Sequence, residues 1–326
     1  MLTNESFMPS EAECAETIRE IHWSDGVFCV ECGSTNVICR TRIYREHYHR
    51  YECCDCGRWF NDLSGTIFEH SKIPLRYWFY TIREMDKGQP TTAIAEAIPF
   101  SYPATLRMVH LIQESIYQQA VTEQLSGEVE IDDIHLKTGQ QGLECQGREP
   151  RERGLKARGR GRYETDRPLL VAWVERDSPR MALELCRDAG SRTLTTKTLK
   201  QVRPGSRIDT DTWNGYRWLG QVYDHRTVKH SEEYVTEDGV HCNTAEAEWS
   251  VFRPWWRTFR GVAKRNAYRY LATYAYQRNR REATSMERFH EILDFYFAVL
   301  DWLRLHSDLS QMHFIGLPYE GLLRLH

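Results

Sequence analysis

Acidic residues in two short stretches of the sequence are candidates for holding a metal ion. The stretch "SRIDTDTWNGYRW", residues 206–218, places Asp209 and Asp211 just before residues typical of a turn. Residues two apart on a strand share a face, so alternation does not choose between the two aspartates. Asp211 lies nearer the carboxyl end of the predicted strand, where side chains open onto a crevice and ligands tend to bind.

A second acidic strand is predicted upstream, in "EVEIDDIHL". Val129 and Ile131 should face the core, so Glu128, Glu130 and Asp132 should face the other way. Asp133 would then share the core side, where a charge is costly to bury. Asp132 is therefore the better candidate of the adjacent pair.

A third carboxylate, Glu246, lies in "HCNTAEAEWSVFR", which is predicted to be helical. Acids at strand ends also serve as turn formers, and Asn243 to Glu246 has the spacing of a helix capping box. Taken as a set, however, three carboxylates can hold two divalent cations roughly 3.5–4 Å apart, the arrangement used in phosphodiester chemistry.

Four cysteines have the spacing of a zinc site. Cys29 and Cys32 form one C-x-x-C pair, Cys53 and Cys56 form another, and a glycine follows each pair. Two such pairs joined by a hairpin supply four thiolates to a tetrahedral zinc, although redox chemistry is the alternative. Cys54 lies inside the second pair, but only Cys53 has the required spacing with Cys56.

The net charge of −3 conceals a basic block near the carboxyl end of the chain. Residues 253–281 contain nine Arg and Lys and no Asp or Glu, whereas residues 282–308 contain six acids and two bases. Such a block can attract phosphates, although it is also compatible with a solvated helix face.

Composition and length limit the class of protein. A chain of 326 residues with 41% apolar residues suggests two or three domains with a packed core. The N-terminal residues do not resemble a signal peptide, and no apolar run reaches the ~20 residues of a membrane span. We therefore expect a cytoplasmic protein without a membrane partner, in which clustered cysteines indicate metal rather than disulfides.

Hydrophobic periodicity predicts the elements that position these residues. Helices are expected at 10–22, with a Ser10–Glu13 capping box, and in a three-helix unit over 71–122. Strands and one helix follow over 125–282, which indicates an α/β domain interrupted by a Gly- and Arg-rich loop at 139–167. Later helices are expected at 244–253, 265–281 and 285–306, with Pro254 breaking or kinking the first.

These motifs, in this order, resemble insertion-sequence transposases of the ISXO type. The matching stretches cover about residues 20–282: "CVEC", "YECCDCGRWFNDLSGTIFEHSKIPLRYW", "EVEIDDIHLKTG", "DTDTWNGYRWL", "HRTVKHSEEYV", "HCNTAEAEW" and "YLATYAYQRNRR". The resemblance implies an α/β fold, with an RNase H-like DDE catalytic domain preceded by a zinc ribbon and a helix-turn-helix. It divides the chain into an N-terminal helix (1–24), the ribbon (25–66), the helix-turn-helix domain (67–124), the catalytic domain (125–283) and a helical extension (284–326).

The resemblance also implies site residues and cofactors. Asp132, Asp211 and Glu246 would form the catalytic triad and hold two Mg²⁺ or Mn²⁺ ions, with His241 and Asn243 in support. The four cysteines would hold structural Zn²⁺. His225 and His230 flank a predicted strand and could either approach the metals or be ordinary core or surface histidines.

The partner implied by the resemblance is DNA, both the terminal inverted repeats of the element and the target. "ATLRMVHLIQ" is expected to be the recognition helix, with Thr105 and Arg107 near its exposed start. A homo-oligomer is expected. Further phosphate contacts are expected from Arg158, Arg160, Arg162, Arg253, Arg257, Arg260, Lys264 and Arg265.

Two other functions stay open at this point. One is a nuclease of the same fold, such as a junction resolvase, against which the ribbon and the helix-turn-helix argue. The other is a catalytically dead or domesticated transposase that acts as a DNA-binding regulator and needs no carboxylates.

Overall fold

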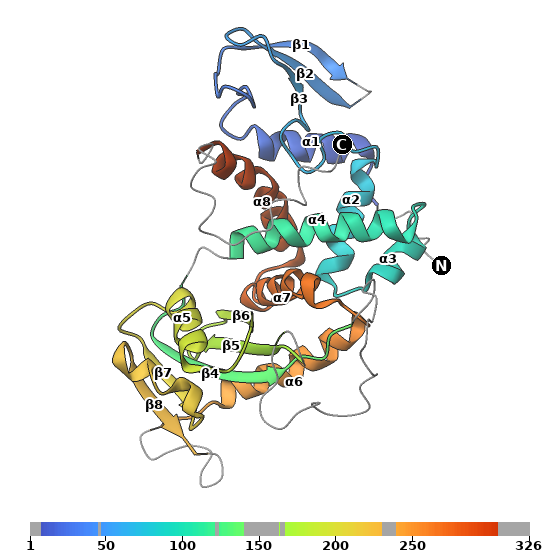
Figure 1. Ribbon diagram of the computed structural model, residues 1–326. Coiled ribbons are helices and arrows are strands. Elements are labelled where there is room, and N and C mark those ends of the chain that lie inside the picture. Colours follow the sequence, from blue (N-terminus) through green and yellow to red (C-terminus); the bar gives the residue numbers. More distant parts are fainter. Residues whose placement is uncertain are drawn as a thin grey trace, which may run out of the picture. The chain divides into compact units, whose positions relative to one another are not determined.

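A computed structural model describes residues 8–44, 47–120, 124–139, 163, 167–229 and 239–305 (Figure 1). The chain forms two compact units. The first contains residues 1–14 and 72–292, and the second contains residues 15–71 and 293–326.

The second unit is a small antiparallel sheet with an aromatic core. Strands β1 (Val37–Tyr44), β2 (Tyr48–Cys53) and β3 (Trp59–Asn61) pair in the order β1-β2-β3. Trp23, Tyr51 and Phe60 are buried together beneath the sheet. Helix α1 (Glu11–His22) precedes it and begins with the predicted capping box, in which the Glu13 N–H binds Ser10 Oγ and the Ser10 N–H binds Glu13 Oε2.

A buried aspartate ties the end of α1 to this sheet. Asp62 is fully buried, and its carboxylate accepts hydrogen bonds from Trp23 Nε1 at 3.1 Å and from the Tyr51 hydroxyl at 2.9 Å. Arg19 lies 3.2 Å from the same carboxylate and supplies the opposite charge. A buried charge is tolerated only with such partners, so Asp62 fixes how the helix packs on the ribbon.

In the first unit, three helices follow residue 72 along the chain. They are α2 (Leu75–Asp86), α3 (Thr91–Ala97) and α4 (Tyr102–Ala120). They occupy the predicted three-helix unit. Helix α4 packs along α7 (Lys264–Asn279), where Glu114 accepts hydrogen bonds from Tyr268 and Arg269. The expected exposure of Thr105 is wrong: the side chain is fully buried and donates to the Ser101 carbonyl, whereas Arg107 is exposed.

A five-stranded mixed sheet follows. Its strands are β4 (Glu128–His135), β5 (Leu169–Glu175), β6 (Met181–Cys186), β7 (Arg207–Asp211) and β8 (Asp224–Val228), paired in the order β6-β5-β4-β7-β8. The β6-β5 and β5-β4 pairs are antiparallel, whereas β4-β7 and β7-β8 are parallel. The predicted strands are thus confirmed, and β4 lies at the centre of the sheet.

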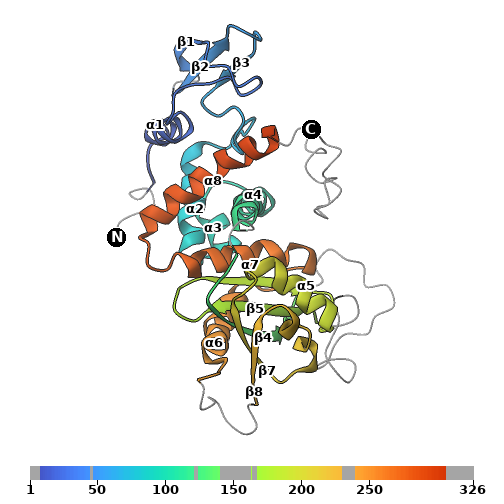
Figure 2. The ribbon, with the colours of Figure 1, turned by 90° about the vertical axis from the view of Figure 1, so that its left-hand side faces the viewer.

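Helices cover both faces of this sheet, which Figure 2 shows with α6 and α5 on opposite sides. One face packs Val129, Ile131 and Trp173 against α5 (Ser191–Gln201) and the 3₁₀ segments η2 (Asn214–Tyr216) and η3 (Leu219–Gln221). The other face packs Leu170 and Ala172 against α6 (Asn243–Thr258) and α7. Alternating residues of one strand therefore enter two different cores.

Helix α6 continues through Pro254 to Thr258, so of the expected break or kink the break is wrong, as is the predicted end at residue 253. Phe252 and Trp256, on either side of the proline, are both buried in the core shared with α7. This packing outweighs the loss of one backbone hydrogen bond. The last described helix, α8 (Ser285–Leu305), follows. Among the described residues, no helix is both long and apolar enough to cross a membrane.

Candidate active site

The sheet brings Asp132 and Asp211 to equivalent positions on neighbouring parallel strands. The last paired residues of β4 and β7 are Ile131 and Thr210, and the two aspartates are the next residue on each strand. Parallel strands present their carboxyl ends at one edge of a sheet, where ligands bind. The two strand-borne candidates therefore lie side by side.

Asp132 is half-buried and held in place by two hydrogen bonds. Trp249 Nε1, from α6, donates to Oδ2 at 2.9 Å, and the Asp133 N–H donates to Oδ1 at 2.8 Å. The pKa of Asp132 is raised to about 6, chiefly by burial and to a smaller extent by the charges of Asp133 and Glu246, while these two hydrogen bonds act in the opposite direction. The charge of Glu246 thus reaches Asp132, but among the described residues Asp132, Asp211 and Glu246 do not form a group with ligand atoms all within 4.8 Å of one another.

Asp133 faces the opposite side of the sheet, as alternation predicts. The buried hydroxyl of Tyr216, in η2, donates to Asp133 Oδ1 at 3.0 Å, which compensates the predicted cost of placing a charge there. Burial and the charges of Asp133, Asp211 and Asp132 all raise the pKa of Tyr216. The negative charges of Asp132, Asp133 and Asp211 therefore all disfavour ionisation of the Tyr216 hydroxyl.

Helix α6 carries Glu246 in its first turn, and Glu130 of β4 binds the start of that helix. Glu130 Oε2 accepts the N–H groups of Thr244 and Ala245 at 2.8 and 3.1 Å, and Oε1 accepts the Thr244 hydroxyl at 2.9 Å. The suggested capping box is wrong: the N-cap residue is Cys242, and Glu130 satisfies N–H groups that a capping box would bind locally. Glu246 itself is exposed.

Asp209 has an environment unlike that of Asp211. It is buried, and Arg207 and Arg176 bind its carboxylate at 2.9 and 2.6 Å. Asp211 is half-buried at the strand end, where its Oδ1 accepts the Trp213 N–H at 3.0 Å. The position-based choice of Asp211 over Asp209 is therefore consistent with the geometry.

The residues expected in support lie nearby. His241 Nδ1 is 3.1 Å from Glu130 Oε1, and Asn243 is exposed at the start of α6. His225, on β8, places Nε2 2.9 Å from Thr210 Oγ1, and burial lowers its pKa. His230 lies outside the described residues.

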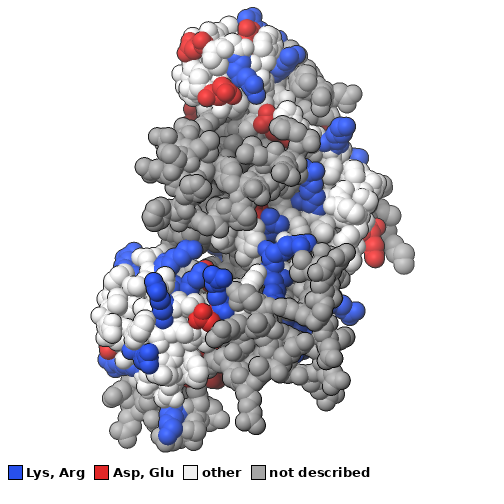
Figure 3. Space-filling model, viewed as in Figure 1, with Lys and Arg blue, Asp and Glu red and all other residues white. Residues whose placement is uncertain are grey.

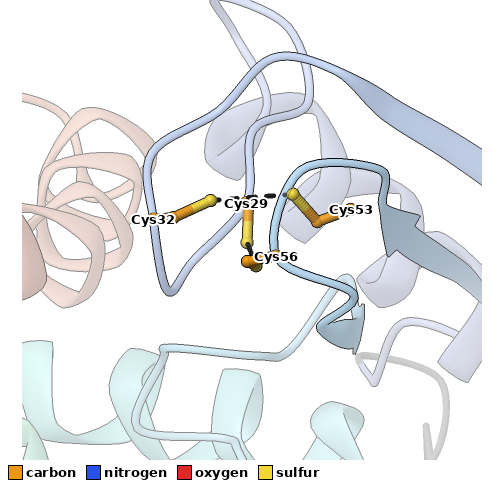
Figure 4. A group of neighbouring side chains, drawn as sticks. All are labelled: Cys29, Cys32, Cys53 and Cys56. Atoms are coloured by element: carbon orange, nitrogen blue, oxygen red, sulfur yellow. Dashed lines mark hydrogen bonds between the residues drawn. The ribbon is translucent and has the colours of Figure 1, made fainter.

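The second candidate metal centre is the cysteine cluster in the ribbon. Figure 4 shows Cys29, Cys32, Cys53 and Cys56 converging from two loops, and their sulfur atoms all lie within 4.8 Å of one another. Cys29 and Cys56 are 3.6 Å apart, as are Cys32 and Cys53. Four sulfurs bound tetrahedrally at ~2.3 Å are ~3.8 Å apart, so this spacing fits zinc.

Two glycines shape the loops around the cysteine cluster. Gly33 and Gly57 both have positive φ, at 74° and 73°, and their N–H groups bind the carbonyls of Cys29 and Cys53. Backbone hydrogen bonds from Cys56 and Asp55 lower the pKa of Cys53 to about 7, whereas burial and the neighbouring thiols raise the pKa of Cys56 and of Cys32. The described cysteines are all free of disulfides, and Cys54 is not among the four that converge.

The basic residues predicted to contact phosphates differ in exposure and in hydrogen bonding. Arg253, Arg257, Arg260 and Arg265 are exposed, whereas the Lys264 ammonium donates to the Tyr163 carbonyl. On the face drawn in Figure 3, Lys and Arg side chains are more prominent than Asp and Glu. A cleft in the first unit is lined by Arg257, Arg260 and Arg265 together with Tyr102 and Leu106 of α4. Arg158, Arg160 and Arg162 lie outside the described residues.

Sequence reasoning missed three residues that organise these sites: Asp62, Glu130 and Arg176. The alternation that placed Asp132 on the face away from Val129 and Ile131 also placed Glu130 there, so the sequence did offer a signal for Glu130. Asp62 and Arg176 follow strands without any distinctive motif.

Comparison with known proteins agrees with the geometry. Residues 124–279 match the family described as the ISXO2-like transposase domain. The chain is also 31% identical over 289 residues to a protein of Halobacterium salinarum described as an uncharacterized protein in transposable element ISH50. That similarity covers 87% of this chain and 96% of the relative.

A mixed α/β domain with neighbouring carboxylates on two parallel strands, together with a separate four-cysteine cluster, is compatible with the transposase class of proteins. Within that class, the chain belongs to the ISXO2-like insertion-sequence transposases.

Proposed function

We propose that the chain is a DDE transposase that cleaves DNA at the ends of its element and joins the freed 3′-hydroxyl to target DNA. Asp132, Asp211 and Glu246 would hold two Mg²⁺ or Mn²⁺ ions. When bound, such a pair activates the attacking oxygen and stabilises the leaving oxygen of a phosphodiester. The catalytic domain would have the RNase H-like fold.

One observation carries this proposal: the parallel register of β4 and β7, which puts Asp132 beside Asp211 where β7 ends and its pairing with β4 stops. The carboxylates suit a hard divalent cation, because such ions prefer oxygen ligands. The raised pKa of Asp132 also fits, since a desolvated carboxylate near Asp133 and Glu246 lacks the positive charge that a cation would supply.

The chain's own side chains would prepare this centre. Trp249 and the Asp133 N–H fix the orientation of the Asp132 carboxylate, and the Trp213 N–H does the same for Asp211. Tyr216 holds Asp133 on the opposite face of the sheet.

The cysteine cluster would hold structural Zn²⁺ through Cys29, Cys32, Cys53 and Cys56. So small a sheet buries few residues, and the metal would supply folding free energy that burial does not. The observed sulfur spacing supports this assignment.

DNA would contact basic residues on the first unit. Arg107 is exposed on α4, and the cleft places Arg257, Arg260 and Arg265 near the same helix. Contacts to phosphates would give salt-dependent affinity without reading sequence, and α4 would supply recognition as part of a helix-turn-helix. The predicted domain boundaries and a homo-oligomeric state belong to this proposal.

The test is cleavage of a duplex oligonucleotide that carries the element end, with Mg²⁺ or Mn²⁺. We expect the wild type to cut at the element boundary and Asp132→Asn, Asp211→Asn and Glu246→Gln to bind DNA without cutting. Binding without cleavage by the wild type as well would favour the non-catalytic regulator. Equal cleavage by all four proteins would show that the triad is assigned to the wrong residues.

A further inference from the structure

A network of charged side chains, largely buried, adjoins two of the proposed metal ligands on β4 and β7. Arg176 follows β5, and its guanidinium donates to Glu130 Oε1 at 3.0 Å, Glu128 Oε2 at 2.5 Å and Asp209 Oδ2 at 2.6 Å. The same guanidinium donates to the His241 carbonyl at 3.2 Å. Glu130 and Asp209 are 0% and 1% exposed, so their charges depend on these bonds.

The network is in register with the candidate site. Glu130 precedes Asp132 by two residues on β4, and Asp209 precedes Asp211 by two residues on β7. Residues two apart on a strand share a face, so each network carboxylate lies next to a proposed ligand on the same side of the sheet. Arg176 binds both carboxylates and so joins the two strands on that side.

The third ligand is fixed by the same network. Glu130 binds the N–H and hydroxyl groups of Thr244, two residues before Glu246, and the negative charge of Glu130 is favourable at a helix N-terminus. The side chain of Glu130 is thus bonded both to Arg176 and to the helix that carries Glu246. All three proposed ligands are therefore attached to one hydrogen-bonded unit.

A buried network of ion pairs contributes little net stability to the folded protein. Replacing buried ion pairs by apolar side chains of similar size is often neutral or stabilising, because desolvating charges is costly. Charge-assisted hydrogen bonds have narrow angular preferences, whereas apolar contacts have none. The charged network can therefore fix the relative position of β4, β7 and α6 more precisely than apolar side chains could.

We propose that Glu130, Arg176 and Asp209 are positioning residues that set the spacing of Asp132, Asp211 and Glu246 for metal binding. This proposal rests on the proposed function of those three carboxylates. The network itself does not touch the metals; it acts through the two strands and the helix. Residues behind a metal site that orient its ligands typically change metal affinity roughly 10–100-fold when substituted.

Two variants separate positioning from simple electrostatics. Arg176→Met removes a positive charge and leaves the surroundings more negative, so electrostatic attraction alone would tighten Mn²⁺ binding. Glu130→Gln removes a negative charge but keeps an oxygen for the α6 N–H groups, so electrostatics alone would weaken binding slightly. Positioning predicts weaker Mn²⁺ binding in both variants.

The experiment measures Mn²⁺ binding to zinc-loaded, DNA-free full-length protein by electron paramagnetic resonance, together with the thermal unfolding midpoint of each variant. A matched control is Arg288→Met, since Arg288 forms a bidentate pair with Asp86 at similar exposures of 15% and 3%, away from the site. We expect both network variants to bind Mn²⁺ roughly tenfold or more weakly, while Arg288→Met loses stability without losing Mn²⁺ affinity.

The possible outcomes separate failure of the positioning proposal from failure of the metal site itself. If Asp211→Asn abolishes Mn²⁺ binding while Arg176→Met and Glu130→Gln retain wild-type affinity, the positioning proposal is overturned and the metal site stands. If Asp211→Asn also leaves Mn²⁺ binding unchanged, the metal site and the positioning proposal both fall. Should Arg176→Met not fold, the near-isosteric Glu130→Gln decides by magnitude: Mn²⁺ binding weakened roughly tenfold or more supports positioning, and a smaller loss overturns it.

Discussion

Asp209 and Asp211 stand two residues apart on β7 and have opposite environments. Asp209 is buried with its carboxylate bound by two arginines, whereas Asp211 ends the strand beside the turn at Trp213. The Asp209 carboxylate accepts three hydrogen bonds from guanidinium groups, whose positive charge would also repel a metal cation. The same strand therefore supplies one structural acid and one acid available for chemistry.

The first prediction compares these two aspartates. Asp209→Asn should lower the free energy of unfolding by about 3 kcal/mol, because Arg176 and Arg207 lose the buried carboxylate that they share. Asp211→Asn should change it by less than about 1 kcal/mol, because that position is only half-buried. Urea unfolding of the two variants beside the wild type measures both. Equal destabilisation would contradict the assigned environments.

The second prediction concerns pH and Asp132. The folded-state pKa of about 6 lies above the ordinary value, so the protonated form favours folding. That contribution is complete below the unfolded-state value of 3.8, is still mostly present at about pH 4, and is lost as pH rises through 6. Asp132→Asn should therefore match wild-type stability near pH 4 and exceed it at pH 7.5 by up to about 3 kcal/mol.

Urea titrations of both proteins without added Mg²⁺ or Mn²⁺ check this pH dependence. Comparing the two at each pH cancels the titration of other groups. A stability difference that stays constant from pH 4 to 7.5 would show that Asp132 is not desolvated in the folded protein.

The third prediction concerns zinc. Cys53→Ser should lose bound zinc and the circular dichroism of the ribbon, because the metal holds both loops together. Cys54→Ser should keep both, since Cys54 is not in the sulfur cluster. Atomic absorption of purified protein measures the zinc content. Wild-type zinc in Cys53→Ser, or loss in Cys54→Ser, would overturn the ligand assignment.

The fourth prediction tests the buried carboxylate of Asp62. Asp62→Ala should destabilise the ribbon by about 3 kcal/mol, because Trp23, Tyr51 and Arg19 lose a shared buried partner. Hydrogen exchange of the β2 amides reports this locally. Glu52→Gln, which breaks a surface pair with Arg40, should leave the exchange nearly unchanged and serves as the control.

The fifth prediction concerns the cleft. Arg257→Gln with Arg265→Gln should reduce the slope of log affinity against log salt by about 2, if each arginine neutralises one phosphate. Fluorescence anisotropy with element-end duplex between 50 and 200 mM salt measures the slope. Arg192→Gln, which removes one exposed positive charge on α5, is the control and should leave the slope unchanged. A slope unchanged in the double variant would remove these arginines from the DNA interface.

Local patterns predicted the elements well because their signals are short-range. Alternation around Val129 and Ile131 predicted β4 and the face on which Asp132 lies, and the C-x-x-C spacing selected Cys53 over Cys54. The Ser10–Glu13 capping box was likewise readable, since its residues are three apart.

The parts that were missed depend on contacts between distant segments. Glu130 caps α6 across 114 residues of sequence, which displaced the local box suggested for Asn243. Thr105 is buried by tertiary packing, and α6 continues through Pro254 for the same reason. Arg176 has no motif, because its importance comes from three carboxylates that only the fold brings to it.

The most direct measurement is anomalous diffraction from crystals of the protein soaked in Mn²⁺. We predict two manganese peaks roughly 3.5–4 Å apart, held by Asp132, Asp211 and Glu246. Manganese bound elsewhere, or the three carboxylates directed into separate regions with no ion between them, would contradict this prediction.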